Sequence, residues 1–226
     1  MRDALAGVLD PELDQSIVEL GFVQRIRIEA AGHPQDAAAR ARVRVELRLP
    51  TYWCAPNFSW MMVEDARAAL LVDPRVADVE VALVDHHAAE EVSTGVGAGR
   101  AFGEVFGAAP DGRLGDLRDL FRRKALLARQ ERALRPLGLP DEDLARLHIG
   151  DLPDTDDVRT YLAARAELGL DCSPRAPALT DAAGRPVSGE AAAAHLRRAR
   201  LMRVSIEGNA AFCRGLLATR YGEVSR

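Results

Sequence analysis

The segment from Val43 to Leu49 alternates strictly between apolar and charged residues, and it is the clearest periodic pattern in the sequence. Apolar side chains stand at positions 43, 45, 47 and 49, and Arg44, Glu46 and Arg48 stand between them. A period of two residues is typical of a β-strand with one buried and one solvated face. The sequence therefore predicts a strand here whose apolar side packs against a core.

The segments on either side of this strand complete a small mixed domain. A short helix over residues 2–9 is predicted to end at Asp10–Pro11, because the residue before a proline avoids the helical region. A strand follows Gly21, a helix is predicted over residues 58–71, and a last strand carries apolar residues at positions 79, 81 and 83. We predict an α+β domain over residues 1–85, in the order α-β-β-α-β, with a three-stranded sheet.

The sequence changes character after residue 85. Six glycines between residues 86 and 112, the last of them Gly112, predict a Gly-rich linker. They do not form the dinucleotide-binding fingerprint, because Arg100 occupies the position of its third glycine. Beyond the linker only helical periodicity is found, so an all-α domain is predicted over residues 113–226. Its longest helix carries an apolar seam of Leu196, Ala199, Met202, Ile206, Ala210, Cys213 and Leu217.

Composition restricts the classes of function. The formal net charge is −4, so the chain as a whole does not attract nucleic acid or anionic lipid. Three widely spaced cysteines form neither a disulfide framework nor a Cys-x-x-Cys metal site. No apolar run approaches the roughly 20 residues that cross a bilayer, and Asp3 interrupts any secretory signal. We therefore expect a cytoplasmic protein.

Cys54 is the most informative single side chain. It lies in a loop bounded by Pro50 and Pro56, just before a predicted helix. The positive end of a helix dipole stabilises a thiolate, the form that binds soft metals. The alternative is that Cys54 is a small buried hydrophobic residue, as many free cysteines are. A single thiolate cannot hold a structural zinc ion, so a metal at Cys54 needs further ligands from another chain, a small thiol or a client.

Three separated motifs resemble a known family. They are Asp10–Pro11–Glu12, the run from Ser16 to Val23, and Pro50–Thr51–Tyr52 followed by Cys54. Residues 1–85 are similar to the small iron–sulfur cluster assembly-factor domain of the SufT-like and PaaD-like proteins and the cytosolic iron–sulfur targeting factors. The resemblance implies that Cys54 is the reactive cysteine and transient metal contact, in a cofactor-binding pocket with Asp10, Glu12 and Thr51.

What the resemblance implies about function is an accessory role in assembling or inserting an iron–sulfur or related metal centre. The expected cofactor is a transient iron–sulfur cluster or iron, with none stably bound. The expected partner is a client metalloenzyme, such as a multicomponent oxygenase, or another assembly factor, and a homodimer is left open. An alternative from another class is a non-catalytic interaction subunit that stabilises an oxygenase system through the basic helix and the apolar seam, with Cys54 inert.

Other clusters carry weaker signals. Asp10, Glu12 and Asp14 form either an acidic rim beside the thiol or a solvated turn. His86 with Glu90, and His87 with Glu91, would be two-ligand pairs if the segment is helical. The basic residues of the helix after the linker indicate a solvated face or a docking surface for an acidic partner, rather than a nucleic-acid site; they are Arg118, Arg122, Arg123, Lys124, Arg129, Arg132 and Arg135.

Catalytic signatures are missing from the sequence. No Gly-x-Ser-x-Gly elbow is present, and none of the five histidines, His33 among them, has a nucleophile or acid partner at motif spacing. We therefore expect no enzymatic activity. Cys213 is predicted to be buried in the seam, and Cys172 has no predicted partner.

Overall fold

The computed structural model describes residues 1–31, 40–107 and 114–222. His33 and Gly112, named above, lie outside the described residues. The chain divides into two compact units, one of residues 1–116 with 209–226, and one of residues 117–208. Each unit has a hydrophobic core of its own.

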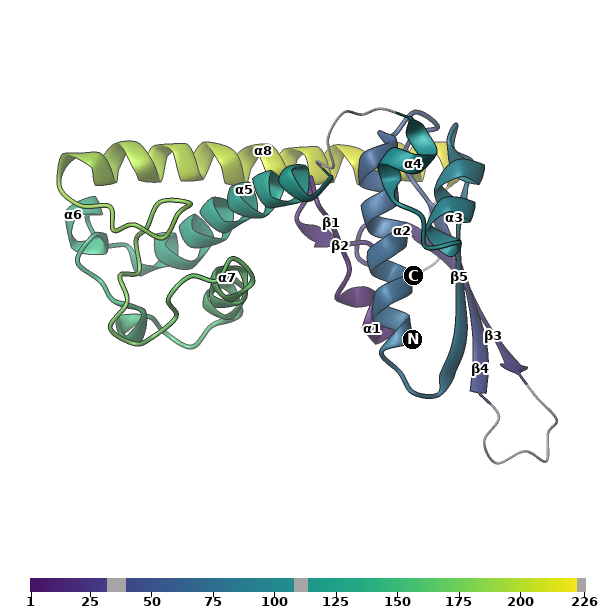
Figure 1. Cartoon of the computed structure of the whole chain (residues 1–226). Coiled ribbons are helices and arrows are strands. Elements are labelled where there is room, and N and C mark those ends of the chain that lie inside the picture. The colour runs from purple at the N-terminus through teal and green to yellow at the C-terminus, as the bar shows by residue number, and fades with distance from the viewer. Residues whose placement is uncertain (32–39, 108–113, 223–226) are drawn as a thin grey trace. The chain divides into compact units, whose positions relative to one another are not determined.

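The first unit is built on a three-stranded sheet in the order β3 (Val23–Ala31), β4 (Arg40–Arg48) and β5 (Val76–Val84). β3 and β4 are antiparallel, whereas β4 and β5 are parallel. A parallel pair needs a crossover connection, and α2 (Pro56–Leu71) provides it (Figure 1). The predicted α+β class and the three-stranded sheet are confirmed.

The two faces of the sheet differ as the alternation in β4 predicts. On the inner face Val43, Val45 and Leu47 are buried, and the register pairs them with the buried apolar residues of β5. On the outer face charged side chains pair across strands, with Arg44 Nε 2.7 Å from Glu80 Oε2. Exposed pairs of this kind stabilise a protein little, so burial of the inner face holds the sheet.

The elements that cover the inner face include α1 (Arg2–Ala6), the two-stranded hairpin of β1 (Leu9–Asp10) and β2 (Gln15–Ser16), and α2. α2 starts at Pro56, two residues before the predicted start, because a proline fits the first helical turn. Its buried face is wider than one stripe, and includes Trp60, which is 1% exposed. The helix therefore lies deep in the core of this unit.

The segment predicted as a Gly-rich linker contains two helices, α3 (Ala89–Gly97) and α4 (Phe102–Phe106). The prediction of a flexible connection is therefore wrong for these residues. α3 packs on β5, and a Cβ atom at Gly95 would lie 2.7 Å from the Trp60 ring. Phe102 also contacts this ring, edge on, at 5.6 Å between centroids. Gly95 thus allows close packing, a use of glycine that composition alone does not distinguish from flexibility.

The second unit is helical. Thr155 caps one of its helices by accepting a hydrogen bond from the Val158 backbone N–H at 3.3 Å. The helices after residue 113 are α5 (Leu114–Leu134), η1 (Arg135–Leu137), α6 (Asp141–Leu144), η2 (Ile149–Asp151), α7 (Asp156–Glu167) and α8 (Glu190–Tyr221).

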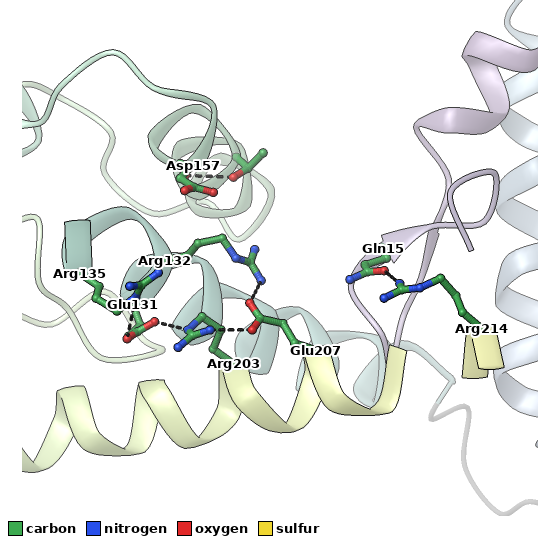
Figure 2. A network of polar contacts seen from close by, with 9 residues as sticks. Gln15, Glu131, Arg132, Arg135, Asp157, Arg203, Glu207 and Arg214 are labelled. Atoms are coloured by element: carbon green, nitrogen blue, oxygen red, sulfur yellow. Dashed lines mark hydrogen bonds and ion pairs between the residues drawn. The ribbon is translucent and has the colours of Figure 1, made fainter. Parts of the chain in front are cut away.

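Buried polar groups in the second unit are connected to one another. The Tyr161 hydroxyl accepts hydrogen bonds from Gln130 and Arg165, at 2.9 and 2.8 Å. Gln130 Oε1 in turn lies 2.9 Å from His195 Nε2. Figure 2 shows a second set of contacts, in which Glu131 and Glu207 pair with arginines of α5, η1 and α8. Buried polar side chains that are satisfied in this way stabilise the unit without forming a reactive site.

The apolar seam of α8 serves both cores. Ala192 and Leu196 contact the core of the second unit, whereas Ala210 and Leu217 are buried in the core of the first. The last part of α8 therefore belongs to the compact unit of the sheet. A single seam in the sequence gives no sign of this division, because periodicity shows which face of a helix is buried and not what covers it.

Candidate functional site

Cys54 lies in the turn between β4 and α2 and is half-buried against the core of the first unit. Thr51 Oγ1 lies 3.3 Å from the Cys54 sulfur, so the structure brings these two predicted site residues together. Two backbone amides in the first turn of α2, those of Phe58 and Ser59, both donate to the Ala55 carbonyl oxygen. These two amides are therefore engaged within the helix, and the Thr51 hydroxyl lies beside the thiol.

His86, two residues after the end of β5, hydrogen-bonds the backbone of the Cys54 turn. The His86 ring is 5% exposed, and its Nε2 atom lies 2.7 Å from the Cys54 carbonyl oxygen. Its Nδ1 atom accepts from the Ala88 backbone N–H at 3.1 Å, so the neutral ring carries its proton on Nε2 and donates it to Cys54. Burial lowers the pKa of His86, which favours this neutral form.

The Asp10 side chain hydrogen-bonds the backbone of the turn between β1 and β2. Its Oδ1 atom accepts hydrogen bonds from the backbone N–H groups of Glu12 and Leu13, at 2.8 and 2.9 Å. The side chain is 6% exposed, and burial raises its pKa to about 6. The second oxygen, Oδ2, accepts no hydrogen bond from the residues that the structure describes. The sequence allowed either an acidic rim beside the thiol or a solvated turn. The structure has a turn at this place, but Asp10 is buried in it.

The end of α8 borders this turn. Arg214 Nη1 donates to the side-chain oxygen of Gln15, which pairs with Asp10 in the β1–β2 hairpin (Figure 2). The neighbouring thiol, Cys213, is half-buried in the same core that Cys54 contacts. Burial above all, with a smaller effect of nearby negative charge, raises the pKa of Cys213 to about 11.

Contacts at its last turn hold α8 against the sheet. Arg220 Nη2 lies 2.9 Å from Asp85 Oδ2, and the Tyr221 hydroxyl donates to the same carboxylate. The Arg48 guanidinium lies over the Tyr221 ring at 4.2 Å. Residues at the ends of β4 and β5 thus fix the helix beyond Cys213.

Beside Cys54 the turn presents exposed aromatic side chains that our sequence reasoning did not use. Trp53 is 75% exposed, and the His87 ring stacks on it at 5.4 Å between centroids. Tyr52 meets Trp53 edge on at 4.9 Å. The signal in the sequence was the run Tyr52–Trp53 next to the candidate residue Cys54. These rings form a surface that a partner protein can contact close to the thiol.

The predicted histidine–glutamate pairs do not form a helical site. α3 starts at Ala89, so His86 and His87 precede it, and the two rings stack on each other at 4.6 Å. Among the residues that the structure describes, no group of three or more His, Cys, Asp and Glu side chains is arranged to hold a metal ion. His86 therefore acts on the Cys54 turn through hydrogen bonds.

The basic residues of α5 have several different environments. Arg129 is buried and donates to the Thr160 carbonyl oxygen at 3.2 Å, and Arg132 pairs with Glu207. Arg122 and Arg123 are exposed. Part of the positive charge is thus used inside the helical unit. Cys172 is exposed in a loop of the same unit and lies within 3.7 Å of the Leu162 carbonyl oxygen.

Residues 1–83 match the family model described as "Iron-sulfur cluster assembly protein". The match ends one residue before the end of β5 and confirms the resemblance drawn from the sequence motifs. No curated protein and no solved structure matches the chain. In the described parts of the chain, no helix combines the length and apolar character needed to cross a membrane.

Proposed function

We propose that this chain assists the assembly or insertion of an iron–sulfur or related metal centre into a client enzyme, with Cys54 as the transient contact to iron or sulfur. The match of residues 1–83 indicates an iron–sulfur cluster assembly role. The specific role of Cys54 is supported by its position. Its sulfur is half-buried, His86 hydrogen-bonds the backbone of its turn, and a surface of exposed aromatic rings lies next to it.

Each residue of the candidate site has a role in this proposal. The Cys54 sulfur supplies the ligand, because thiolates bind soft metals and iron–sulfur clusters. Thr51, at 3.3 Å, hydrogen-bonds the sulfur. His86 fixes the backbone of the turn, and Asp10 and Glu12 belong to the same pocket in this proposal, as the resemblance implies. Trp53 and Tyr52 contact the client. In this role the chain is an accessory protein and catalyses no reaction of its own.

The buried carboxylate of Asp10 supports a site at this place. Burial opposes its ionisation, so at neutral pH the charged form costs the fold free energy. A carboxyl group with a strongly shifted pKa is more typical of a functional site than of a stabilising turn. An asparagine would satisfy the same two backbone N–H groups without that cost, so a carboxylate here is suited to interaction with a cation.

The experiment is cluster transfer from the purified chain. The chain is loaded anaerobically with ferrous iron and sulfide, and transfer to an apo [2Fe–2S] ferredoxin is followed by visible absorbance. We expect transfer from the wild type and from Cys172→Ser, whose thiol is exposed in the other unit. Cys54→Ser should retain its circular dichroism spectrum and lose transfer. Equal transfer by Cys54→Ser would refute the role of Cys54.

The alternative, a non-catalytic subunit that stabilises an oxygenase system, gives the opposite result, since Cys54 is then inert. One of its two expected surfaces is not available, because Ala199, Ile206 and Ala210 of the apolar seam are buried. The exposed rings of Tyr52 and Trp53 serve either function. Unchanged transfer in Cys54→Ser, together with loss of a partner complex in Trp53→Ala, would support this alternative.

A further inference from the structure

We propose that a groove between α6 and α8 binds an acidic amphipathic helix of a partner protein. The groove is a cavity of about 270 Å³ bounded by α8, by α6 and by the chain around η1. All of its lining residues belong to residues 117–208, so it lies within the second unit. It lies outside the family match and contains no cysteine, so the inference goes beyond the proposed function and does not depend on Cys54.

The floor of the groove is apolar. Leu144 and Leu196 line it and also pack in the hydrophobic core of the second unit. Leu139 lines it too and is exposed to solvent. The volume is just below the range of small-molecule pockets, which is roughly 300–1,000 Å³. The groove therefore suits apolar side chains of a partner better than it suits a whole cofactor.

Two arginines on the α8 side of the groove are available to a ligand. Arg197 and Arg200 both line the groove, are three residues apart and are exposed. No partner for either side chain, by hydrogen bond or ion pair, is found among residues 1–31, 40–107 and 114–222. A guanidinium group binds a carboxylate through two parallel hydrogen bonds. These two side chains can therefore bind the carboxylates of an acidic partner.

The other charged side chains of the groove set the orientation of the partner. Glu131 is buried, and its carboxylate pairs with Arg135 and Arg203, as Figure 2 shows. Its negative charge is therefore already balanced. Asp141 is exposed at the start of α6 and lines the groove from that side. Because Asp141 repels anions, the carboxylates of the partner must face α8.

The groove continues along α8 as an exposed stripe. Arg197, Arg200 and Val204 are separated by three and four residues, so they lie on one face of the helix. Val204 and the nearby Leu201 are exposed apolar side chains. A patch of apolar side chains next to arginines is typical of a protein interface. A partner helix along this stripe would present its own side chains at the same spacing.

Charge favours a protein partner over nucleic acid or a lipid surface. Residues 117–208 carry 16 Arg and Lys residues and 14 Asp and Glu residues, so the second unit as a whole is almost neutral. Nucleic acid and anionic membranes attract extended positive surfaces. A local basic groove with an apolar floor is complementary to a short acidic helix that carries leucines on one face.

The first test is binding of a fluorescein-labelled helical peptide to the full chain, read from fluorescence anisotropy. The peptide consists of glutamate, alanine and leucine, with the leucines on one face. We expect Arg197→Glu and Arg200→Glu each to weaken binding by about tenfold or more, at 1.4 kcal/mol per factor of ten. Arg198→Glu is the matched control. It makes the same change of charge on α8 outside the groove and should bind nearly as the wild type does.

A second set of variants tests the floor and the orientation. Leu139→Ala should weaken binding, whereas Leu120→Ala, at an exposed apolar position of α5 outside the groove, should not. Asp141→Asn should strengthen binding, because it removes a negative charge from the groove. A peptide with lysine in place of glutamate should not bind. With the acidic peptide bound, hydrogen exchange should slow over residues 193–204 of α8.

The outcomes are distinct. Equal losses in Arg197→Glu and Arg198→Glu would show attraction by overall charge and overturn the inference, as would a wild type that does not bind the peptide. Binding to phosphatidylserine vesicles in place of the peptide, lost in Arg197→Glu, would assign the groove to a lipid surface and overturn the protein partner. The arginines are exposed, so the variants should fold, which circular dichroism checks. Cys54→Ser should bind the peptide as the wild type does, which separates this inference from the proposed function.

Discussion

The Nε2 atom of His86 lies 2.7 Å from the backbone carbonyl oxygen of Cys54, 32 positions earlier in the chain. Because the Nδ1 atom of the same ring accepts from the Ala88 N–H, the ring joins the turn before α2 to the start of α3. The Cys54 turn is therefore held by a side chain that is itself hydrogen-bonded at both ring nitrogens. This geometry suits a neutral imidazole and no other ionisation state.

Replacing His86 with alanine should loosen the Cys54 turn. The change leaves the buried Ala88 N–H and the Cys54 carbonyl oxygen without a partner, at a cost of about 1–3 kcal/mol in the free energy of unfolding. We also expect faster alkylation of Cys54 by iodoacetamide. His86→Gln, whose side chain both donates and accepts, is the control and should lose less. Urea unfolding at pH 7.5 and alkylation rates check this, and wild-type values in His86→Ala would contradict it.

Acid should weaken the same contact. Because the pKa of His86 is lowered in the fold, the unfolded chain binds its proton first as the pH falls through about 6.5. The native state then resists protonation, so this residue makes the free energy of unfolding decrease on acidification, until the pH reaches its folded pKa. The difference between the wild type and His86→Gln, measured by urea unfolding at pH 7.5 and 5.5, isolates this effect. A difference independent of pH would exclude it.

Asp10 should change the free energy of unfolding with pH in the direction opposite to His86. Its pKa is raised from 3.8 to about 6, so between these values the native state binds more protons than the unfolded chain. The free energy of unfolding therefore falls as the pH rises through this window, by about 3 kcal/mol in total at 1.36 kcal/mol per pKa unit. Asp10→Asn should lack this decrease and be the more stable protein above pH 6.

The measurement for Asp10 is urea unfolding of the wild type and Asp10→Asn at pH 4.5 and 7.5. Asparagine retains the acceptor for the Glu12 and Leu13 N–H groups, so the turn itself should be unchanged. Cluster transfer should decrease in the same variant, because the proposed function assigns the Asp10 carboxylate to the same pocket as Cys54. A variant that is less stable than the wild type at pH 7.5 would show that the carboxylate stabilises the turn.

The end of α8 should stabilise the sheet. Leu217 is 3% exposed in the core of the first unit, and its replacement by alanine should cost about 2–5 kcal/mol. We expect faster hydrogen exchange of backbone amides in β4 and β5. Phe212→Ala, on the exposed side of the same helix, is the matched control and should change stability by no more than about 0.5 kcal/mol. Unchanged hydrogen exchange in Leu217→Ala would show that α8 does not stabilise this core.

The buried network of the helical unit should depend on one hydroxyl. Tyr161 accepts from Gln130 and Arg165 and donates to the Ala178 carbonyl oxygen at 2.9 Å. Tyr161→Phe leaves these buried groups unsatisfied and should cost about 1–3 kcal/mol. The control is Thr160→Ala, which removes an exposed hydroxyl one residue away. Thermal unfolding of the two variants checks this, and equal melting temperatures would contradict it.

Much of the fold follows from local pattern. The alternation from Val43 to Leu49 predicts both the strand and its buried face, since successive side chains of a strand point to opposite sides. The order of the three motifs predicts the family that matches residues 1–83. The glycines of residues 86–112 misled the prediction, because Gly95 is needed for contact with Trp60, a residue 35 positions away.

The sequence by itself determined the sheet, the helical character of the second half, and the turn that carries Cys54. Only the tertiary structure decided that His86 binds this turn, that Asp10 is buried, and that the end of α8 joins the first unit. The physical reason is that periodicity reports which face of an element avoids water and is silent about the surface that covers it.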